Sequence, residues 1–181
     1  MSIWVCSDWH ANHNKPFIWE DRGFNNIDEM NKEIIRRHNE LVLPDDEVYT
    51  LGDCCLGGDL DFGKNFIESL NGKIHIIRGN HCTDKKAEMY LTCKNVLDVS
   101  WGTMLKYRKY HFFLSHYPCL ASNFDTEEPL KIRTISLCGH YHTKDCFADI
   151  DKGLIFHCEM DTNDCRPWLL DDIIEKIKER V

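Results

Sequence analysis

The sequence predicts one α/β domain that contains two β-sheets. The first half alternates short apolar runs with helical patterns, in the order strand, helix, strand, helix, strand, helix. The second half consists mainly of short apolar or alternating runs separated by turn residues, a pattern typical of strands. A chain of 181 residues normally forms one domain and can bury a continuous core, so we expect residues 1–181 to fold as a unit.

The elements of the first half follow from local patterns. Ser2 to Ser7 is predicted as a short buried strand, followed by a polar loop from Asp8 to Asn14. Ile27 to Val42 has apolar residues at a helical period, with Asn25 or Asn26 as the N-cap. The other predicted elements of this half are strands at residues 47–51 and 73–78 and helices at residues 60–70 and 84–91.

The second half is predicted to be mostly antiparallel. Ala121 to Arg133 is predicted as a surface loop, and Trp168 to Arg180 as an amphipathic helix that begins after Pro167. The predicted strands of this half are residues 96–99, 104–107, 111–115, 134–138, 146–150 and 154–158.

Composition narrows the class of protein. A formal net charge of −8 argues against a general nucleic-acid coat, which needs a basic face. It permits a phosphate substrate, because bound divalent cations would reverse the local field. No apolar stretch approaches a membrane span and the N-terminus lacks a basic region, so we expect a cytoplasmic protein. The ten cysteines include no Cys-x-x-Cys pair, and we interpret most of them as buried apolar residues.

Five short clusters of polar residues follow predicted strands. Each contains side chains that can bind a divalent metal, and ligands bind at the carboxyl ends of strands in α/β folds. Asp-x-His and His-x-His place two side chains on the same side of an extended segment. A glycine directly before a ligand lets the backbone turn sharply. The clusters are Asp8 with His10, Gly52-Asp53, Gly79-Asn80-His81, Ser115-His116 and Gly139-His140-Tyr141-His142.

Taken singly, such residues also have explanations that involve no function. Gly52-Asp53 alone is more typical of a turn than of a site. We interpret His75, His111 and His157 as packed or surface residues, and His38 as solvated on the exposed face of the first long helix. Five clusters at strand ends are different, and together they favour a metal centre.

In this order, the five clusters resemble the signature of the calcineurin-like metallophosphoesterases, and the match spans residues 8 to 142. Further segments resemble the small bacterial and bacteriophage branch: residues 8–14, Arg22-Gly23-Phe24 and residues 114–118. The resemblance implies a four-layer α/β/β/α sandwich, in which helices flank two mixed sheets and a dinuclear site lies at the strand ends.

The resemblance also implies a role for each ligand. One metal would bind Asp8, His10 and His142, and the other Asn80, His116 and His140, while Asp53 bridges both. Two ions held this way activate a bridging water as a hydroxide nucleophile, and His81 would protonate the leaving oxygen. Nitrogen and oxygen ligands without thiolates suit manganese first, with iron, nickel or zinc as alternatives.

Two positions depart from related sequences. Gly52-Asp53 continues as Cys54-Cys55, without the Asp-Arg-Gly of the protein Ser/Thr phosphatases, so the acidic partner of the proton donor is missing there. Cys82 stands after His81, where relatives often carry Asp or Glu. Three basic residues near the motifs are candidate substrate contacts: His13, Arg22 and Arg78.

The leading hypothesis is therefore a metal-dependent phosphodiesterase that hydrolyses a small phosphodiester, a cyclic nucleotide being one candidate. The alternatives are a phosphomonoesterase acting on a nucleotide or small phosphorylated metabolite, and a nuclease. The negative charge weighs against the nuclease, because affinity for a phosphate backbone comes mainly from Lys and Arg. A third class, a non-enzymatic binding scaffold, tends to lose ligands, whereas all seven positions here carry competent side chains.

Overall fold

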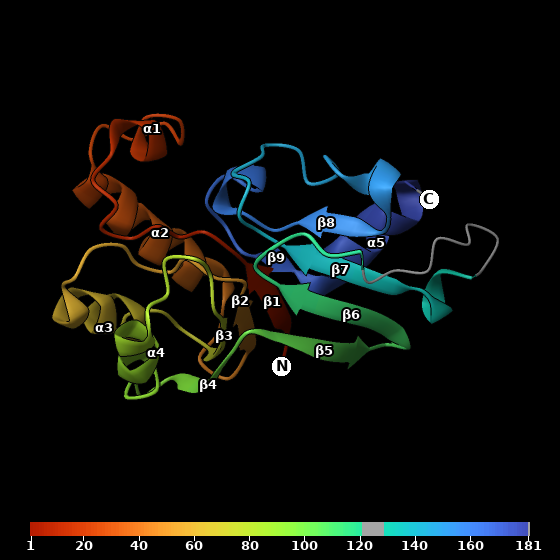
Figure 1. Ribbon diagram of the computed structural model, residues 1–181, viewed down its shortest axis with the longest axis horizontal. Coiled ribbons are helices and arrows are strands. Elements are labelled where there is room, and N and C mark those ends of the chain that lie inside the picture. The colour runs from red at the N-terminus through yellow and green to blue at the C-terminus, as the bar shows by residue number, and fades with distance from the viewer. Residues whose placement is uncertain (121–128, 181) are drawn as a thin grey trace.

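The chain forms a five-stranded and a four-stranded sheet with helices packed around them in a computed structural model that describes residues 1–120 and 129–180 (Figure 1). The strands are β1 (Ile3–Cys6), β2 (Glu47–Thr50), β3 (Lys73–Ile77), β4 (Val96–Ser100), β5 (Gly102–Tyr107), β6 (Tyr110–Ser115), β7 (Thr134–Cys138), β8 (Ile155–His157) and β9 (Trp168–Leu169). The helices are α1 (Pro16–Trp19), α2 (Ile27–Leu41), α3 (Leu60–Glu68), α4 (Asp84–Tyr90) and α5 (Leu170–Arg180), with short 3₁₀ turns η1 (Leu130–Ile132), η2 (Ile150–Lys152) and η3 (Met160–Thr162).

The first sheet has the order β4-β3-β2-β1-β9, and its β1 to β4 pairs are parallel. Successive residues of its strands alternate between two cores, as the pleat requires. Val48 packs with α2, α3 and α4 on one face, whereas Tyr49 packs toward the second sheet. Figure 1 shows these helices on one side of the sheet and α5 near β9. The expected α/β/β/α sandwich of two mixed sheets is confirmed.

The second sheet has the order β5-β6-β7-β8 and corrects one expectation. Only the β5–β6 pair is antiparallel, because β7 and β8 both run parallel to their neighbours. β4, which was predicted in this region, joins the first sheet instead. The predicted strand at residues 146–150 is wrong as well, since that segment forms turns leading into η2. Of the predicted loop Ala121 to Arg133, residues 121–128 lie outside the described residues.

The helices begin where the sequence places their caps. The side chain of Asn26 accepts a hydrogen bond from the Glu29 N–H at the start of α2, and Asp59 and Thr83 do the same for α3 and α4. The predicted C-terminal helix is shorter than expected, because Trp168–Leu169 pair with β1 as strand β9. Within the described parts of the chain, no helix is both long and apolar enough to cross a membrane.

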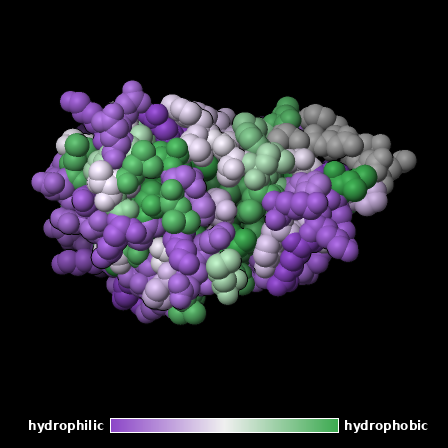
Figure 2. Space-filling model, turned by 90° about the horizontal axis from the view of Figure 1, so that it is seen from below, coloured by the Kyte–Doolittle hydropathy of each residue, from purple (hydrophilic) through white to green (hydrophobic). Residues whose placement is uncertain are grey.

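His38 and the cysteines show how the interior is filled. His38 lies on the buried face of α2, with Nε2 2.9 Å from the Asn71 carbonyl, so its predicted exposure is wrong. All ten cysteines are free thiols, and eight are buried, which confirms that most of them serve as small apolar residues. Among the exposed large apolar side chains, four belong to the segment from the end of α4 to β5: Leu91, Leu97, Trp101 and Met104. Figure 2 views this lower side, where apolar atoms are surrounded by polar ones.

Candidate metal centre

The loops after β1 and β2 continue the parallel pairing of their strands and so align the first two clusters. The Asp8 N–H donates to the Gly52 carbonyl at 3.1 Å, and the His10 N–H donates to the Asp53 carbonyl at 3.0 Å. Asp8, His10 and Asp53 have left-handed backbones, with φ of 59°, 49° and 46°. Such backbones are costly for residues other than glycine and concentrate at functional sites. The local chain is therefore held in an unfavourable conformation by its neighbours.

A first group of metal-binding atoms gathers around Asp8. Its Oδ1 lies 3.4 Å from His10 Nε2 and 3.6 Å from His142 Nε2. The other oxygen, Oδ2, accepts hydrogen bonds from the Ser7 hydroxyl and the His140 N–H. Asp8, His10 and His142 thus offer atoms within 4.8 Å of one another, from the ends of β1 and β7.

A second group gathers around His116. Its Nε2 lies 2.8 Å from Asn80 Oδ1 and 3.2 Å from His140 Nδ1, while its Nδ1 lies 2.8 Å from the Leu51 carbonyl. Asp53 lies between the two groups, because Oδ2 is 3.5 Å from His116 Nε2 and 3.8 Å from His10 Nε2. The structure therefore brings together all seven residues that the sequence predicts as ligands.

This arrangement fits cations. Asp8 Oδ1 is buried and has no hydrogen-bond donor among the described residues, which is costly for a carboxylate unless a cation satisfies it. The Nε2 atoms of His10 and His142 face each other at 2.9 Å beside this oxygen. Imidazole nitrogens and carboxylate oxygens converging in this way are the ligand set of divalent transition metals.

Electrostatics favour an ionised carboxylate at Asp8 and neutral imidazoles at His10 and His140. Burial would raise the pKa of Asp8, but His10, whose Nε2 lies 3.4 Å from Asp8 Oδ1, opposes it and the pKa falls to about 2. Burial lowers the pKa of His10, and burial together with His116 lowers the pKa of His140. Metals bind the neutral imidazole and the ionised carboxylate, so these three shifts favour binding. Burial would lower the pKa of His142 as well, but its contacts with Asp161 and Asp8 outweigh burial and raise that pKa instead.

The glycines act in two different ways. Gly52 has φ +109°, and a Cβ there would lie 2.6 Å from His116 Nδ1, so this position needs glycine for both its conformation and its space. A Cβ on Gly79 would collide with Asp53 Oδ1, and one on Gly139 with Ser7 Oγ and Asp8 Oδ2. Neither of these two glycines has a positive φ, so they provide close approach rather than the sharp turn predicted from the sequence.

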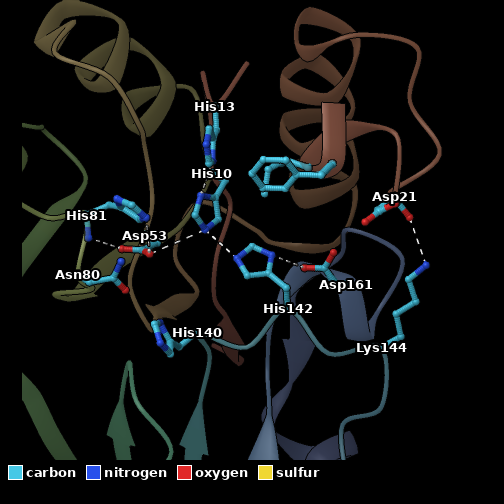
Figure 3. Close-up of a pocket in the computed structure, with 12 residues that line it drawn as sticks. His10, His13, Asp21, Asp53, Asn80, His81, His140, His142, Lys144 and Asp161 are labelled. Carbon is cyan, nitrogen blue, oxygen red and sulfur yellow. Dashed lines mark hydrogen bonds and ion pairs between the residues drawn. The ribbon is translucent and has the colours of Figure 1, made fainter. Parts of the chain in front are cut away.

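A pocket of about 540 Å³ opens over the two groups (Figure 3). His81 lines it with a side chain that is 43% exposed, and His81 Nε2 is 3.9 Å from Asp53 Oδ2. His13, a predicted substrate contact, also lines the pocket, with Nδ1 3.1 Å from His10 Nδ1. Burial and the neighbouring histidines His10 and His81 lower the pKa of His13 to about 4, so its ring is neutral at pH 7.

The other two predicted substrate contacts are placed elsewhere. The Arg22 side chain is 1% exposed and donates to the Asp8 and Trp9 carbonyls and to Asp161. Arg78 stacks over Trp101 at 4.2 Å and donates to the Cys82 carbonyl and to Asp84. Neither lines the pocket, so their positions do not support a direct contact with substrate.

Several site residues were missed from the sequence. Asp161 Oδ2 lies 3.3 Å from His142 Nδ1. Phe17 and Ile18 of α1 and Lys144 line the pocket. The buried Lys86 donates to the Cys55 and His81 carbonyls and so joins two ligand-bearing loops. Asp161 lies four residues after the end of β8, as His10 and His142 do after β1 and β7, so its position was a usable signal, whereas the other residues lie farther from a strand end and in no recognisable motif.

Comparison with known proteins agrees with this geometry. The sequence profile of the calcineurin-like phosphoesterases matches residues 1–179. This chain belongs to the calcineurin-like phosphoesterase family. The family is dependent on divalent metals, and the two candidate ligand groups described above are consistent with that dependence.

Two further proteins align with nearly the whole chain. The uncharacterized protein MJ1445 of Methanocaldococcus jannaschii is 30% identical over 98% of this chain and 92% of its own length. The crystal structure of AQ665, a protein of unknown function from Aquifex aeolicus, aligns with a TM-score of 0.73. It is 18% identical and covers 96% of this chain and 98% of its own, which shows a shared fold.

Proposed function

We propose that this calcineurin-like phosphoesterase uses two divalent ions to hydrolyse a small phosphodiester. The observation that carries the proposal is the position of Asp53. Its Oδ2 lies within 3.8 Å of His10 Nε2 and 3.5 Å of His116 Nε2, so one carboxylate reaches both groups of ligands. A shared carboxylate is how two-metal phosphoryl-transfer sites hold their ions about 3.5–4 Å apart.

The ligands divide between two positions. Asp8, His10 and His142 would hold one ion, and Asn80, His116 and His140 the other, with Asp53 shared. Such ions, when bound, lower the pKa of a water ligand toward neutrality and neutralise the charge of the phosphoryl oxygens. The set of nitrogen and oxygen donors suits manganese, with iron, nickel and zinc as alternatives.

His81 is proposed as the proton donor to the leaving oxygen. It follows the ligand Asn80, and its partly exposed ring reaches the pocket from the β3 end. Its backbone is fixed, because its N–H donates to Asp53 Oδ1 at 2.9 Å and its carbonyl accepts from Lys86 at 3.0 Å. A fixed backbone with a partly exposed imidazole that lines the pocket suits general acid catalysis.

The residues that line the pocket suit a phosphate ester with an organic group attached. Phe17, which is 62% exposed, and Ile18 form an apolar side beside His13, whose ring packs edge-on against Phe17 at 5.8 Å. Lys144 adds a cation to the lining and donates to the Asp21 carbonyl at 3.4 Å (Figure 3). A flat ring such as a nucleobase could stack on Phe17 while the phosphate faces the ligands, so a nucleotide diester is the candidate substrate.

Hydrolysis of two model substrates tests the proposal. Metal-free protein is loaded in turn with manganese, iron, nickel and zinc and assayed on bis-p-nitrophenyl phosphate and p-nitrophenyl phosphate. We expect faster turnover of the diester with at least one metal. Faster turnover of the monoester would favour a phosphomonoesterase on a nucleotide or phosphorylated metabolite. Absence of turnover on both, with all four metals, would contradict the proposal.

A further inference from the structure

A buried arginine connects three segments of the metal centre. Arg22 lies in the turn after α1, and its Nη1 and Nη2 donate to the Trp9 and Asp8 carbonyls at 3.0 and 2.8 Å. Its Nε and Nη2 also bind the two oxygens of Asp161 in η3, at 3.1 and 2.8 Å. A guanidinium bound to both oxygens of a carboxylate fixes that carboxylate in direction as well as in distance.

Asp161, held in this way by Arg22, in turn contacts the ligand His142. Its Oδ2 lies 3.3 Å from His142 Nδ1, an interaction drawn in Figure 3. With Nδ1 engaged by the carboxylate, the opposite nitrogen, Nε2, faces Asp8 Oδ1 and His10. A carboxylate behind a metal-binding histidine fixes the tautomer and ring orientation and makes the ring a stronger ligand.

The same arginine also acts on the loop after β1. Asp8 and His10 have left-handed backbones, and the two carbonyls that Arg22 binds belong to Asp8 and Trp9, within that stretch. These hydrogen bonds satisfy buried carbonyls in a conformation that the residues would not adopt unaided. One side chain therefore constrains all three residues of the first group, Asp8, His10 and His142.

The second group is oriented by different partners. His116 Nδ1 lies 2.8 Å from the Leu51 carbonyl, and the loop carrying Asn80 is held through Lys86 and Asp53. None of the contacts of Arg22 or Asp161 described above involves these residues. Arg22 and Asp161 therefore act directly on the first position, and the second is linked to them indirectly, through contacts such as the hydrogen bond from the His140 N–H to Asp8 Oδ2.

We propose that Arg22 and Asp161 are positioning residues that set the metal affinity of the position formed by Asp8, His10 and His142, and not that of the position around His116. This inference rests on the proposed two-metal function. Loss of such a supporting partner typically weakens metal binding by about 10–100-fold. The first position should therefore empty while the second stays filled.

Manganese binding to metal-free protein tests this, by calorimetric titration and by electron paramagnetic resonance, which separates coupled ion pairs from single ions. The wild type is expected to bind two ions and give a coupled spectrum. Asp161→Asn, which keeps the side-chain shape, should bind one ion with wild-type affinity and a second about 10–100-fold more weakly. Its spectrum at one to two equivalents should be that of a single ion.

A nearby pair provides the matched control. Arg37 and Asp164 form a similar link, in which Arg37 Nη1 donates to Asp164 Oδ1 at 2.9 Å, but Asp164 contacts none of the ligands in the hydrogen bonds and ion pairs of the described residues. Asp164→Asn should bind both ions as the wild type does. Arg22→Lys serves as the second test variant, and thermal unfolding in EDTA checks that each variant folds.

The outcomes separate the two proposals. If Asp161→Asn binds both ions with unchanged affinity, or loses both equally, the positioning role is refuted while the two-metal function stands. If the wild type itself binds fewer than two ions, the two-metal function fails, and the inference fails with it.

Discussion

The backbone N–H of His81 donates a 2.9 Å hydrogen bond to Oδ1 of Asp53, whose other oxygen, Oδ2, is shared between the two groups of ligands. The proposed metal bridge therefore also fixes the loop that carries the proposed proton donor. A substitution at Asp53 can change metal binding and loop position together, and the two effects have to be separated by the choice of side chain.

Asp53→Asn makes that separation. The amide retains an oxygen that can accept the His81 N–H, but it removes the negative charge that two cations would share. We expect loss of metal and of turnover, with the fold retained. Metal analysis, hydrolysis of bis-p-nitrophenyl phosphate and circular dichroism measure these three quantities. Wild-type metal content in this variant would argue against the bridge.

His81→Asn should affect catalysis according to the leaving group. A proton donor matters most when the departing oxygen is strongly basic, so an alkyl diester should slow by about 10²–10⁴-fold. A p-nitrophenyl ester, whose leaving group needs little protonation, should slow much less. The comparison requires kcat for both substrates at saturating manganese. Equal losses on both, or loss of bound metal, would assign His81 a different role.

Gly139→Ala should weaken metal binding without a change in any ligand. The new Cβ would collide with Ser7 Oγ and Asp8 Oδ2, so Asp8 must move. Gly58→Ala is the matched control, because a Cβ at Gly58 has open space around it. Manganese titration of the two variants should show reduced affinity only for the first. Wild-type affinity in Gly139→Ala would mean that the loop absorbs the methyl group.

His38 should make the protein less stable in mild acid. Burial lowers its pKa to about 4, whereas an unfolded histidine has a pKa of about 6.5. Between these values the unfolded chain binds a proton that the folded chain does not, so stability falls as the pH falls. The slope from one residue is at most about 1.4 kcal/mol per pH unit, and the loss levels off below about pH 4.

His38→Gln isolates this contribution, since its amide can still donate to the Asn71 carbonyl but does not titrate. Urea unfolding of both proteins in EDTA, at pH 7, 6 and 5, gives the difference in free energy of unfolding. As the pH falls, the free energy of unfolding of the wild type should decrease relative to that of the variant. A difference that stays constant from pH 7 to 5 would contradict the predicted protonation.

The ligands could be located from the sequence because each lies within four residues of the end of a strand. Asp8, Asp53 and Asn80 come from neighbouring parallel strands, whose carboxyl ends necessarily meet at one edge of the sheet. The direction of the later strands could not be read in the same way. An apolar run such as Thr134 to Cys138 has the same pattern whether it runs parallel or antiparallel to its neighbour, and the long connection before it permits the parallel arrangement.

Local sequence patterns did not identify the residues that hold the ligands in position. Arg22 and Asp161 are separated by 139 residues, and nothing near either residue signals the pairing. Arg22 was predicted as a substrate contact because it is a basic residue near the motifs. The structure shows that its side chain is buried and binds two backbone carbonyls, and the sequence gives no sign of these partners. At His38 the helical pattern was correct, but Asn71 on a distant loop supplies the partner that lets an imidazole face inward.

The pairing of β9 with β1 has a consequence for how the protein is made. β1 is synthesised long before the strand that pairs with one of its edges, because that edge is completed only by Trp168 and Leu169, and α5 then adds four buried side chains to the core. On the ribosome, β1 must wait for this pairing until residues 168 and 169 have emerged, and exposed edges of this kind invite aggregation. Chains interrupted before residue 168 should therefore depend on chaperones and be cleared quickly, even though they already contain all seven ligands.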